Sequence, residues 1–228
     1  MNLTLFVLFF SVFCVCYWLR YRKWINPYRL YMVFGKKGSG KSSYLVKQAL
    51  YYQKKGYIIY TNMADMMVTG VRLIDANDIG DFVPVQNSVL LLDEVGMLFD
   101  NRNFRNFKNS TRDFFKLQRH YRVIVFLASQ SYDIDKKLRD LTDEMFLIKN
   151  IGIVYSLVRP IRKSITLTES TSEAESRIAE NLKFRWFFSW RIFKIPRYAR
   201  YFESFQTPEL PEISFSEICE SEGASNRS

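Results

Sequence analysis

The chain has 228 residues, of which 48% are hydrophobic and 17% aromatic, and its formal net charge is +10. This length allows one α/β domain with modest extensions and excludes two large domains. Its three cysteines have no framework spacing, which argues against a disulfide-built secreted protein, and its one histidine, His120, excludes a histidine-based metal site within one chain. Residues 201–228 carry a net charge of −5, so the preceding part carries +15. Such a basic body is typical of proteins that bind nucleic acid or an anionic membrane, and equally of the cytoplasmic side of a membrane protein.

The first 19 residues predict a membrane-spanning helix. They contain no charged side chain, 16 of them are apolar, and a helix of that length spans about 28 Å, close to the hydrocarbon thickness of a bilayer. Residues suited to a membrane interface follow or overlap the end of this run: Tyr17, Trp18, Arg20, Tyr21, Arg22, Lys23 and Trp24. We interpret the segment as an uncleaved anchor; a cleaved signal peptide, which needs basic residues before the apolar run, and a buried core helix are the alternatives. The positive-inside rule then predicts that the N-terminus lies outside and the rest in the cytoplasm, with residues 20–29 as a basic juxtamembrane linker.

A phosphate-binding loop is predicted between a short apolar strand at residues 31–34 and a helix at residues 43–54. The intervening sequence fits G-x-x-x-x-G-K-[ST] in the strand–loop–helix setting that this motif requires. Its glycines let backbone N–H groups converge on phosphate oxygens, and the helix N-terminus adds a partial positive charge. We expect Lys41 to reach the β- and γ-phosphates of ATP and the Ser42 hydroxyl to ligate Mg²⁺. The predicted nucleotide-binding residues are Gly35, Lys36, Lys37, Gly38, Ser39, Gly40, Lys41, Ser42 and Ser43.

Two further strands are predicted to end in polar residues. The apolar run at residues 89–92 suits a central parallel strand, and Asp93 and Glu94 follow it directly. Ligands of open α/β sheets bind at this edge, so we expect Asp93 to join the Mg²⁺ shell and Glu94 to polarise the attacking water. A second buried strand, at residues 123–128, is followed by Ser129, Gln130 and Ser131, where a polar side chain would sense the γ-phosphate or orient water. The alternatives are a solvated acidic turn after the first strand and a simple turn after the second.

The rest of the chain predicts further elements of an α/β fold. Expected elements are a strand at 57–61, an irregular segment at 64–84, an amphipathic basic helix at 104–121, a short helix at 133–141, short strands at 145–148, 153–158 and 164–167 with a hairpin around residue 151, and a polar loop at 168–180. The basic helix is read as a solvated face of a core helix, with a subunit or DNA contact as the alternative.

Residues 183–201 interleave eight aromatic with six basic side chains. These charges exclude a second spanning helix, so we interpret the segment as a membrane-surface or partner-docking element, with a strand pair packed on the domain as the alternative. The expected organisation is an anchor at 1–19, the linker at 20–29, a P-loop domain at 30–167, a C-terminal extension at 168–205 and an acidic tail at 206–228.

Several ordered segments together resemble one family. They read YMVFGKKGSGKSSYLVKQAL, YTNM, VLLLDEVGMLFDNRNF, FFKLQRHYRVIVFLASQSYDIDKKLRDL and FKIPRYARYFESF, between about residues 29 and 205. They are similar to the zonular-occludens-toxin-like (Zot-like) ATPases, the gene I assembly proteins of filamentous bacteriophages. The resemblance implies a mostly parallel sheet flanked by helices, in the P-loop NTPase class near the FtsK/HerA-type translocases. It also implies an ATP hydrolase in the host inner membrane that drives phage assembly and export.

The resemblance extends to individual residues and partners. It implies Walker A roles for Lys41 and Ser42, Walker B roles for Asp93 and Glu94, and a strand-tip role for Gln130. Arg119 and Arg139 lie in matching segments, and either one could act on the γ-phosphate across a subunit interface. The implied partners are further copies of the chain, as in a hexamer, the membrane, phage coat proteins, and phage single-stranded DNA or its binding protein.

One departure from the family pattern concerns the anchor, which precedes the ATPase domain here and follows it in classical members. This puts contacts with an outer-membrane exit channel in doubt. Two other functions stay open: a plasmid or viral DNA-transfer or packaging motor, motivated by the basic helix, and a non-catalytic nucleotide-binding membrane scaffold, motivated by residues 183–201.

Overall fold

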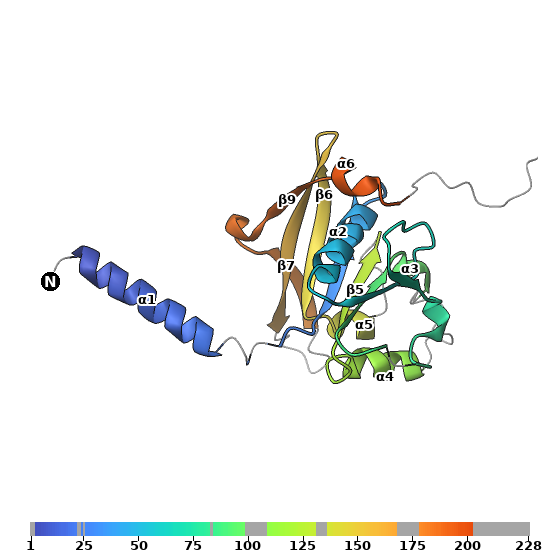
Figure 1. Ribbon diagram of the computed structural model, residues 1–228, viewed down its shortest axis with the longest axis horizontal. Coiled ribbons are helices and arrows are strands. Elements are labelled where there is room, and N and C mark those ends of the chain that lie inside the picture. Colours follow the sequence, from blue (N-terminus) through green and yellow to red (C-terminus); the bar gives the residue numbers. More distant parts are fainter. Residues whose placement is uncertain are drawn as a thin grey trace, which may run out of the picture.

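The computed structural model describes residues 3–21, 24, 26–82, 84–98, 109–130, 136–167 and 178–202 (Figure 1). Within these residues, nine strands form one mixed sheet. Six of them are parallel and lie in the order β3-β2-β4-β5-β1-β6. They are β1 (Leu30–Phe34), β2 (Ile58–Thr61), β3 (Val71–Leu73), β4 (Ser88–Leu92), β5 (Val123–Ser129) and β6 (Glu144–Ile151).

The strand order determines where the site residues meet. β5 lies between β1, which leads into the predicted phosphate loop, and β4, which leads into Asp93 and Glu94. Every residue of β4 and β5 is buried, as expected for central parallel strands covered on both faces. The predicted α/β class with a mostly parallel sheet is confirmed.

An antiparallel extension continues the sheet beyond β6. β7 (Tyr155–Leu167) pairs with β6 on one side, and β8 (Ile178–Phe184) and β9 (Arg191–Lys194) pair with its other side. The predicted hairpin after β6 is confirmed, but the two short strands expected at 153–158 and 164–167 are one strand. Residues 178–180, predicted as loop, belong to β8; residues 168–177 lie outside the described part. The prediction averaged over the polar segment 168–180, whereas its last three residues pair with β7. The sheet therefore crosses the boundary predicted at residue 167.

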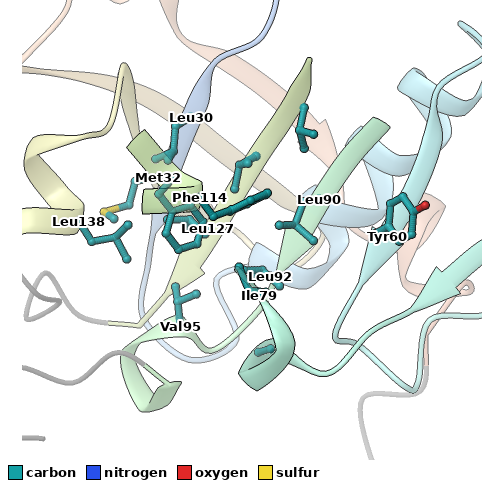
Figure 2. Close-up of a cluster of buried hydrophobic side chains, with 14 of the residues drawn as sticks. Leu30, Met32, Tyr60, Ile79, Leu90, Leu92, Val95, Phe114, Leu127 and Leu138 are labelled. Atoms are coloured by element: carbon teal, nitrogen blue, oxygen red, sulfur yellow. The ribbon is translucent and has the colours of Figure 1, made fainter. Parts of the chain in front are cut away.

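Helices cover both faces of the sheet. They are α2 (Lys41–Gln53), α3 (Val95–Leu98), α4 (Asn109–Leu117), α5 (Lys136–Asp140) and α6 (Pro196–Ala199), with 3-10 turns η2 (Ala76–Asp78) and η4 (Phe187–Ser189). Side chains alternate along each strand. On one face Leu30, Met32 and Leu127 pack against Phe114 of α4 and Leu138 of α5 (Figure 2). On the other face the strands pack against α2, and α6 packs on α2 in turn.

Two predicted segments differ in detail. The segment at 64–84 was expected to be irregular, but it contains β3, which pairs in parallel with β2. Its three residues give too short an alternation to recognise. The basic helix expected at 104–121 is described from Asn109 and ends at Leu117; residues 104–108 lie outside the described part. A turn at 118–122 follows, with Arg122 in the left-handed region at φ 56°, because the chain reverses there to enter β5.

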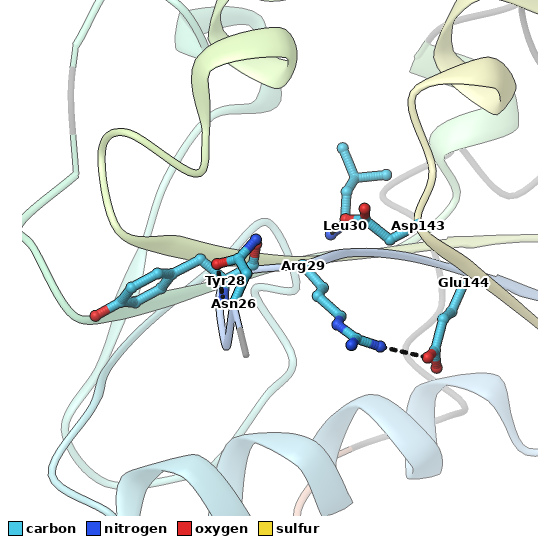
Figure 3. A network of polar contacts seen from close by, with 6 residues as sticks. All are labelled: Asn26, Tyr28, Arg29, Leu30, Asp143 and Glu144. Atoms are coloured by element: carbon cyan, nitrogen blue, oxygen red, sulfur yellow. Dashed lines mark hydrogen bonds and ion pairs between the residues drawn. The ribbon is translucent and has the colours of Figure 1, made fainter. Parts of the chain in front are cut away.

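The N-terminal helix α1 (Leu3–Tyr21) is long and apolar enough to cross a membrane, and its residues 4–21 are exposed. Length and composition fit either an anchor or a signal sequence. The chain then enters the sheet through a polar junction (Figure 3). Arg29 forms an ion pair with Glu144 at the start of β6, and the backbone N–H of Leu30 donates to Asp143 Oδ2 at 2.8 Å. The start of β1 is therefore held in place by side chains of the neighbouring strand.

Candidate nucleotide-binding site

The loop after β1 has the geometry of a phosphate cradle. At Gly35 a Cβ atom would lie 2.4 Å from Ser39 Oγ and 2.7 Å from Ile148 O, so only glycine fits. Gly40 has φ 92°, a left-handed conformation that glycine adopts without steric cost. α2 begins at the next residue, so its free N–H groups open toward the loop. These features confirm the local structure that the motif predicts.

Lys41 lies inside this loop, with only 6% of its surface exposed. Its Nζ donates to Gly35 O at 3.0 Å and to Lys36 O at 3.3 Å. Burial lowers the pKa of Lys41, and the nearby carboxylates of Asp93 and Glu94 oppose that shift. The ammonium group is thus positioned at the base of the loop, where it can donate to a phosphate. Of the other predicted loop residues, Ser39 and Ser43 are buried, whereas Lys36, Lys37 and Gly38 are exposed.

The two residues predicted to bind Mg²⁺, Ser42 and Asp93, contact each other. The Ser42 hydroxyl donates to Asp93 Oδ2 at 2.7 Å, which joins the start of α2 to the end of β4. Burial raises the pKa of Asp93, and the hydrogen bonds from Ser42 and from the Glu94 N–H lower it in part. Hydroxyl and carboxylate oxygens are the ligands that Mg²⁺ prefers. The donor set therefore fits the predicted ion.

Glu94 and Gln130 come together at the tips of β4 and β5. Gln130 Nε2 donates to Glu94 Oε1 at 2.8 Å, and Glu94 has φ 54°, which is uncommon for a residue with a side chain. Residues held in this region cluster at functional sites. The pairing follows from the sheet order, since β4 and β5 are neighbours. Ser131 lies outside the described residues.

Asn62 is a site residue that the sequence reasoning missed. Its Nδ2 donates to Asp93 O at 3.0 Å, and its Oδ1 accepts from the Asp93 N–H at 2.8 Å. The side chain thus binds both polar groups of the Asp93 backbone. Asn62 directly follows β2, which pairs with β4. The available signal was a polar residue at the tip of a parallel strand, the same rule that pointed to Gln130.

The β6–β7 hairpin supports the loop from the other side. Asn150 Nδ2 donates to Gly38 O at 2.8 Å, and the Ser156 hydroxyl donates to Ser39 O at 2.7 Å. Ser156 is fully buried, and its Oγ lies 2.8 Å from the position of a Cβ at Gly40. The sequence reasoning placed a hairpin here but assigned no contact to it. Neither residue matches a local motif, because the contacts are more than 110 positions apart along the chain.

The two arginines predicted to act across a subunit interface lie elsewhere. Arg119 is exposed in the turn that precedes β5, at the edge of the sheet opposite the phosphate loop. Arg139 is in α5, directly before the residues that lead into β6 at that same edge. Neither is brought to the loop of its own chain. A role in the site of another copy stays a prediction.

Comparison with known families gives one match. The family model for zonular occludens toxin (Zot) matches residues 68–184, which is about half of the chain. The chain belongs to the Zot family. The matched region contains Asp93, Glu94 and Gln130, whereas the phosphate loop precedes it, so the Zot assignment and the loop geometry are separate observations. Together with the strand order, they make this a Zot-like P-loop nucleotide-binding domain. No curated protein sequence matches significantly.

Three of the solved structures that align with part of this chain are the following. The N-terminal domain of zonular occludens toxin from Neisseria meningitidis has 15% identity and a TM-score of 0.49, over 58% of this chain and 83% of that one. The genome packaging NTPase B204 of Sulfolobus turreted icosahedral virus 2, in complex with ATP-gammaS, has 15% identity and a TM-score of 0.45, over 59% and 92%. The flagellar accessory protein FlaH from Methanocaldococcus jannaschii has 12% identity and a TM-score of 0.42, over 58% and 77%.

Proposed function

We propose that this Zot-family protein is a membrane-anchored ATPase that hydrolyses ATP to drive filamentous phage assembly and export through the host inner membrane. The observation that carries hydrolysis is the hydrogen bond from Gln130 to Glu94, next to the Ser42–Asp93 contact. A carboxylate held at this position suits activation of a water molecule. The exposed apolar helix α1 supports the membrane anchor, with its N-terminus outside and the domain in the cytoplasm.

Each residue of the site has a distinct task in this proposal. The N–H groups of the loop and Lys41 bind the phosphates and stabilise charge that builds up on them during cleavage. Ser42 and Asp93 would hold Mg²⁺, which would supply positive charge to neutralise the phosphates. Glu94 orients the attacking water and accepts its proton, and Gln130 keeps the Glu94 carboxylate in position. Asn62 fixes the backbone from which both carboxylates project.

A hollow beside the loop offers room for the nucleoside. Its volume is about 490 Å³, and Lys36, Lys37, Ser39, Leu147, Ile148, Lys149 and Asn150 line it. Two of these residues are apolar and the others are polar or cationic, so the hollow offers an apolar wall for a base beside groups that can bind the sugar and phosphates. Because Asn150 also bonds to Gly38 O, a base bound there would touch the same hairpin that supports the loop.

The polar junction before β1 supports a mechanical role for the anchor. Arg29, Leu30 and Asp143 fix the chain where it leaves the basic linker and enters the sheet. A domain attached in this way moves as one body with β1, the strand that carries the phosphate loop. A force that reaches the domain through the linker would then act on the strand that carries the phosphate loop.

Two variants of the full chain in neutral lipid nanodiscs test the chemistry. Glu94→Gln should bind a fluorescent ATP analogue as the wild type does, yet lose multiple-turnover hydrolysis by 10²-fold or more, on the order of a lost catalytic base. Lys41→Ala should weaken binding of the analogue itself. Full turnover in Glu94→Gln would refute the mechanism. Absence of turnover in the wild type, with binding intact, would point to the scaffold function.

The biological role has its own test. In cells producing the phage, Glu94→Gln should stop particle release while coat proteins and single-stranded DNA accumulate inside. Normal release of particles, combined with loss of plasmid or other viral DNA transfer, would favour the DNA-transfer motor. Self-association, measured by mass photometry of the nanodisc-held protein, tests the proposed homo-oligomer.

A further inference from the structure

A short aromatic turn at residues 185–190 interrupts the sheet edge formed by β8 and β9. β8 and β9 follow one another along the same side of β7, from Phe184 opposite Ile161 to Arg191 opposite Val158. Residues 185–190 leave the sheet between them, opposite Pro160. The Pro160 carbonyl accepts from the Arg185 N–H at 3.0 Å, so the proline nitrogen, which has no hydrogen, faces the same side. The missing donor explains why the edge strand breaks here.

The turn at residues 185–190 has its own hydrogen bonds, yet it leaves large aromatic rings in solvent. Ser189 donates to Trp186 O through both its N–H, at 2.9 Å, and its hydroxyl, at 2.7 Å. Trp190 Nε1 donates to Arg185 O at 3.1 Å. Trp186 and Phe188, which these bonds leave on the surface, are each 81% exposed. Large aromatic rings exposed side by side on an ordered turn are typical of a binding surface.

The exposed rings border a basic groove. Its volume is about 610 Å³, and its lining residues are Arg162, Lys183, Phe184, Arg185, Trp186, Phe188 and Ser189. Three of these side chains are cationic, three are aromatic, and none is acidic. Outside this lining, the Arg159 guanidinium lies 4.2 Å from the centre of the Phe184 ring. Cationic and aromatic side chains therefore line one hollow together.

The groove shares two lining residues with a cavity next to the phosphate loop. Lys183 and Phe184 also line this smaller cavity of about 240 Å³, together with Gly35, Lys36 and Gln130. Gln130 is the residue that donates a hydrogen bond to Glu94. A ligand that moves Lys183 or Phe184 would therefore change the surroundings of the phosphate loop and of Gln130.

We infer that this groove binds single-stranded nucleic acid, with bases stacked on Trp186 and Phe188 and phosphates on Lys183, Arg185 and Arg162. Proteins that bind single strands combine these two features: a positive groove that follows the backbone and aromatic faces that stack with any base. A membrane-surface segment would instead present apolar side chains on one face and basic side chains on the other. Here cations and rings line the same hollow, and two of its residues also border the cavity next to the phosphate loop. The inference rests on the proposed function and deepens it, since it assigns the surface that would hold the single strand.

The test measures oligothymidylate binding to the full chain in neutral nanodiscs by fluorescence anisotropy, at several salt concentrations. The double variant Trp186→Ala/Phe188→Ala should bind at least about tenfold more weakly, since stacking of one base contributes on the order of a factor of ten. Lys183→Gln/Arg185→Gln should reduce the slope of log affinity against log salt by about 1.4, from about 0.7 for each lost phosphate contact. Oligothymidylate should also stimulate ATP turnover in the wild type and fail to do so in the aromatic variant.

A matched control removes similar groups from another hollow. The variant Tyr51→Ala/Lys54→Gln changes a residue of α2 and the residue that follows it, in a cavity shared with Arg197 and Arg200. It should bind the oligonucleotide as the wild type does. Lys41→Ala should also bind the oligonucleotide normally. A loss of ATP hydrolysis and a loss of oligonucleotide binding by the groove can therefore be told apart. Equal losses in the control and groove variants would overturn the inference, as would a wild type that does not bind. Unchanged oligonucleotide binding in the aromatic variant, with loss of co-flotation with phosphatidylglycerol vesicles, would identify a membrane contact instead and also overturn it.

Discussion

Asn62 gives the sharpest test of how the site is held together. Its side chain makes two hydrogen bonds to the Asp93 backbone, at 2.8 and 3.0 Å, in a partly buried setting. Each such bond contributes about 1 kcal/mol to stability, so Asn62→Ala should lower the free energy of unfolding by about 2 kcal/mol. The freed backbone also lets Asp93 and Glu94 shift, and a misplacement near 1 Å costs on the order of 10²-fold in rate. We therefore expect turnover per folded molecule to fall by roughly 10- to 100-fold.

The assay combines denaturant unfolding of the full chain with ATP turnover normalised to the fraction folded. Asn62→Asp separates the two bonds, because it keeps the acceptor for the Asp93 N–H and replaces the donor with an oxygen that faces Asp93 O. It should be at least as slow as Asn62→Ala. Asn77→Ala is the control: Asn77 is exposed, and its loss should change stability by less than about 0.5 kcal/mol. A destabilised Asn62→Ala protein with wild-type turnover would show that the two Asn62 hydrogen bonds only stabilise the fold and do not position the carboxylates.

Three further predictions follow from buried contacts of the site. Ser156→Ala leaves Ser39 O without its hydrogen bond, so we expect a loss of about 1–3 kcal/mol in unfolding free energy and weaker binding of an ATP analogue, measured by denaturation and by fluorescence titration. Gly40→Ala forces a left-handed φ on alanine and places its Cβ 2.8 Å from Ser156 Oγ. It should cost at least about 1–2 kcal/mol and reduce analogue affinity, and an unchanged melting temperature would contradict this. Burial raises the folded-state pKa of Asp93 above its ordinary value of 3.8, so the folded protein binds more protons than the unfolded chain over that interval. Stability from this group is present at low pH and is lost as the pH rises through the raised pKa. In the nucleotide-free protein without added Mg²⁺, Asp93→Asn should therefore raise the melting temperature at pH 7 relative to the wild type, with a smaller gain at pH 4.

Local patterns were enough to predict the residues whose roles depend on their immediate neighbours. Lys41 and Ser42 follow a glycine-rich loop after an apolar strand, and Asp93 and Glu94 follow a second one, so their chemistry could be inferred before any fold was known. Gln130 was found by the same rule, because a polar residue at the carboxyl end of a buried strand lies at the ligand edge of a parallel sheet. Asn62 meets that rule as well, because it directly follows the strand predicted at residues 57–61, but the rule was not applied to that strand.

Contacts between distant segments could not be predicted in this way. Ser156 bonds to Ser39 and Asn150 to Gly38 because β6 pairs with β1 and then turns back as β7. No local propensity encodes that pairing, which depends on the complete sheet. The expected C-terminal extension was likewise read from composition, whereas β8 and β9 belong to the sheet itself.

The sequence by itself therefore determined the chemistry of this protein: a phosphate loop at residues 35–42, a carboxylate pair after a buried strand, and an apolar N-terminal helix. Each of these features is a short contiguous segment, so neighbouring residues alone are enough to recognise it. Only the tertiary structure decided the strand order that joins Gln130 to Glu94, the clamp of Asn62 on Asp93, and the groove that brings Lys183 near the loop. These arrangements depend on which strands pair, and strand pairing is settled by burial across the whole domain rather than by any one segment.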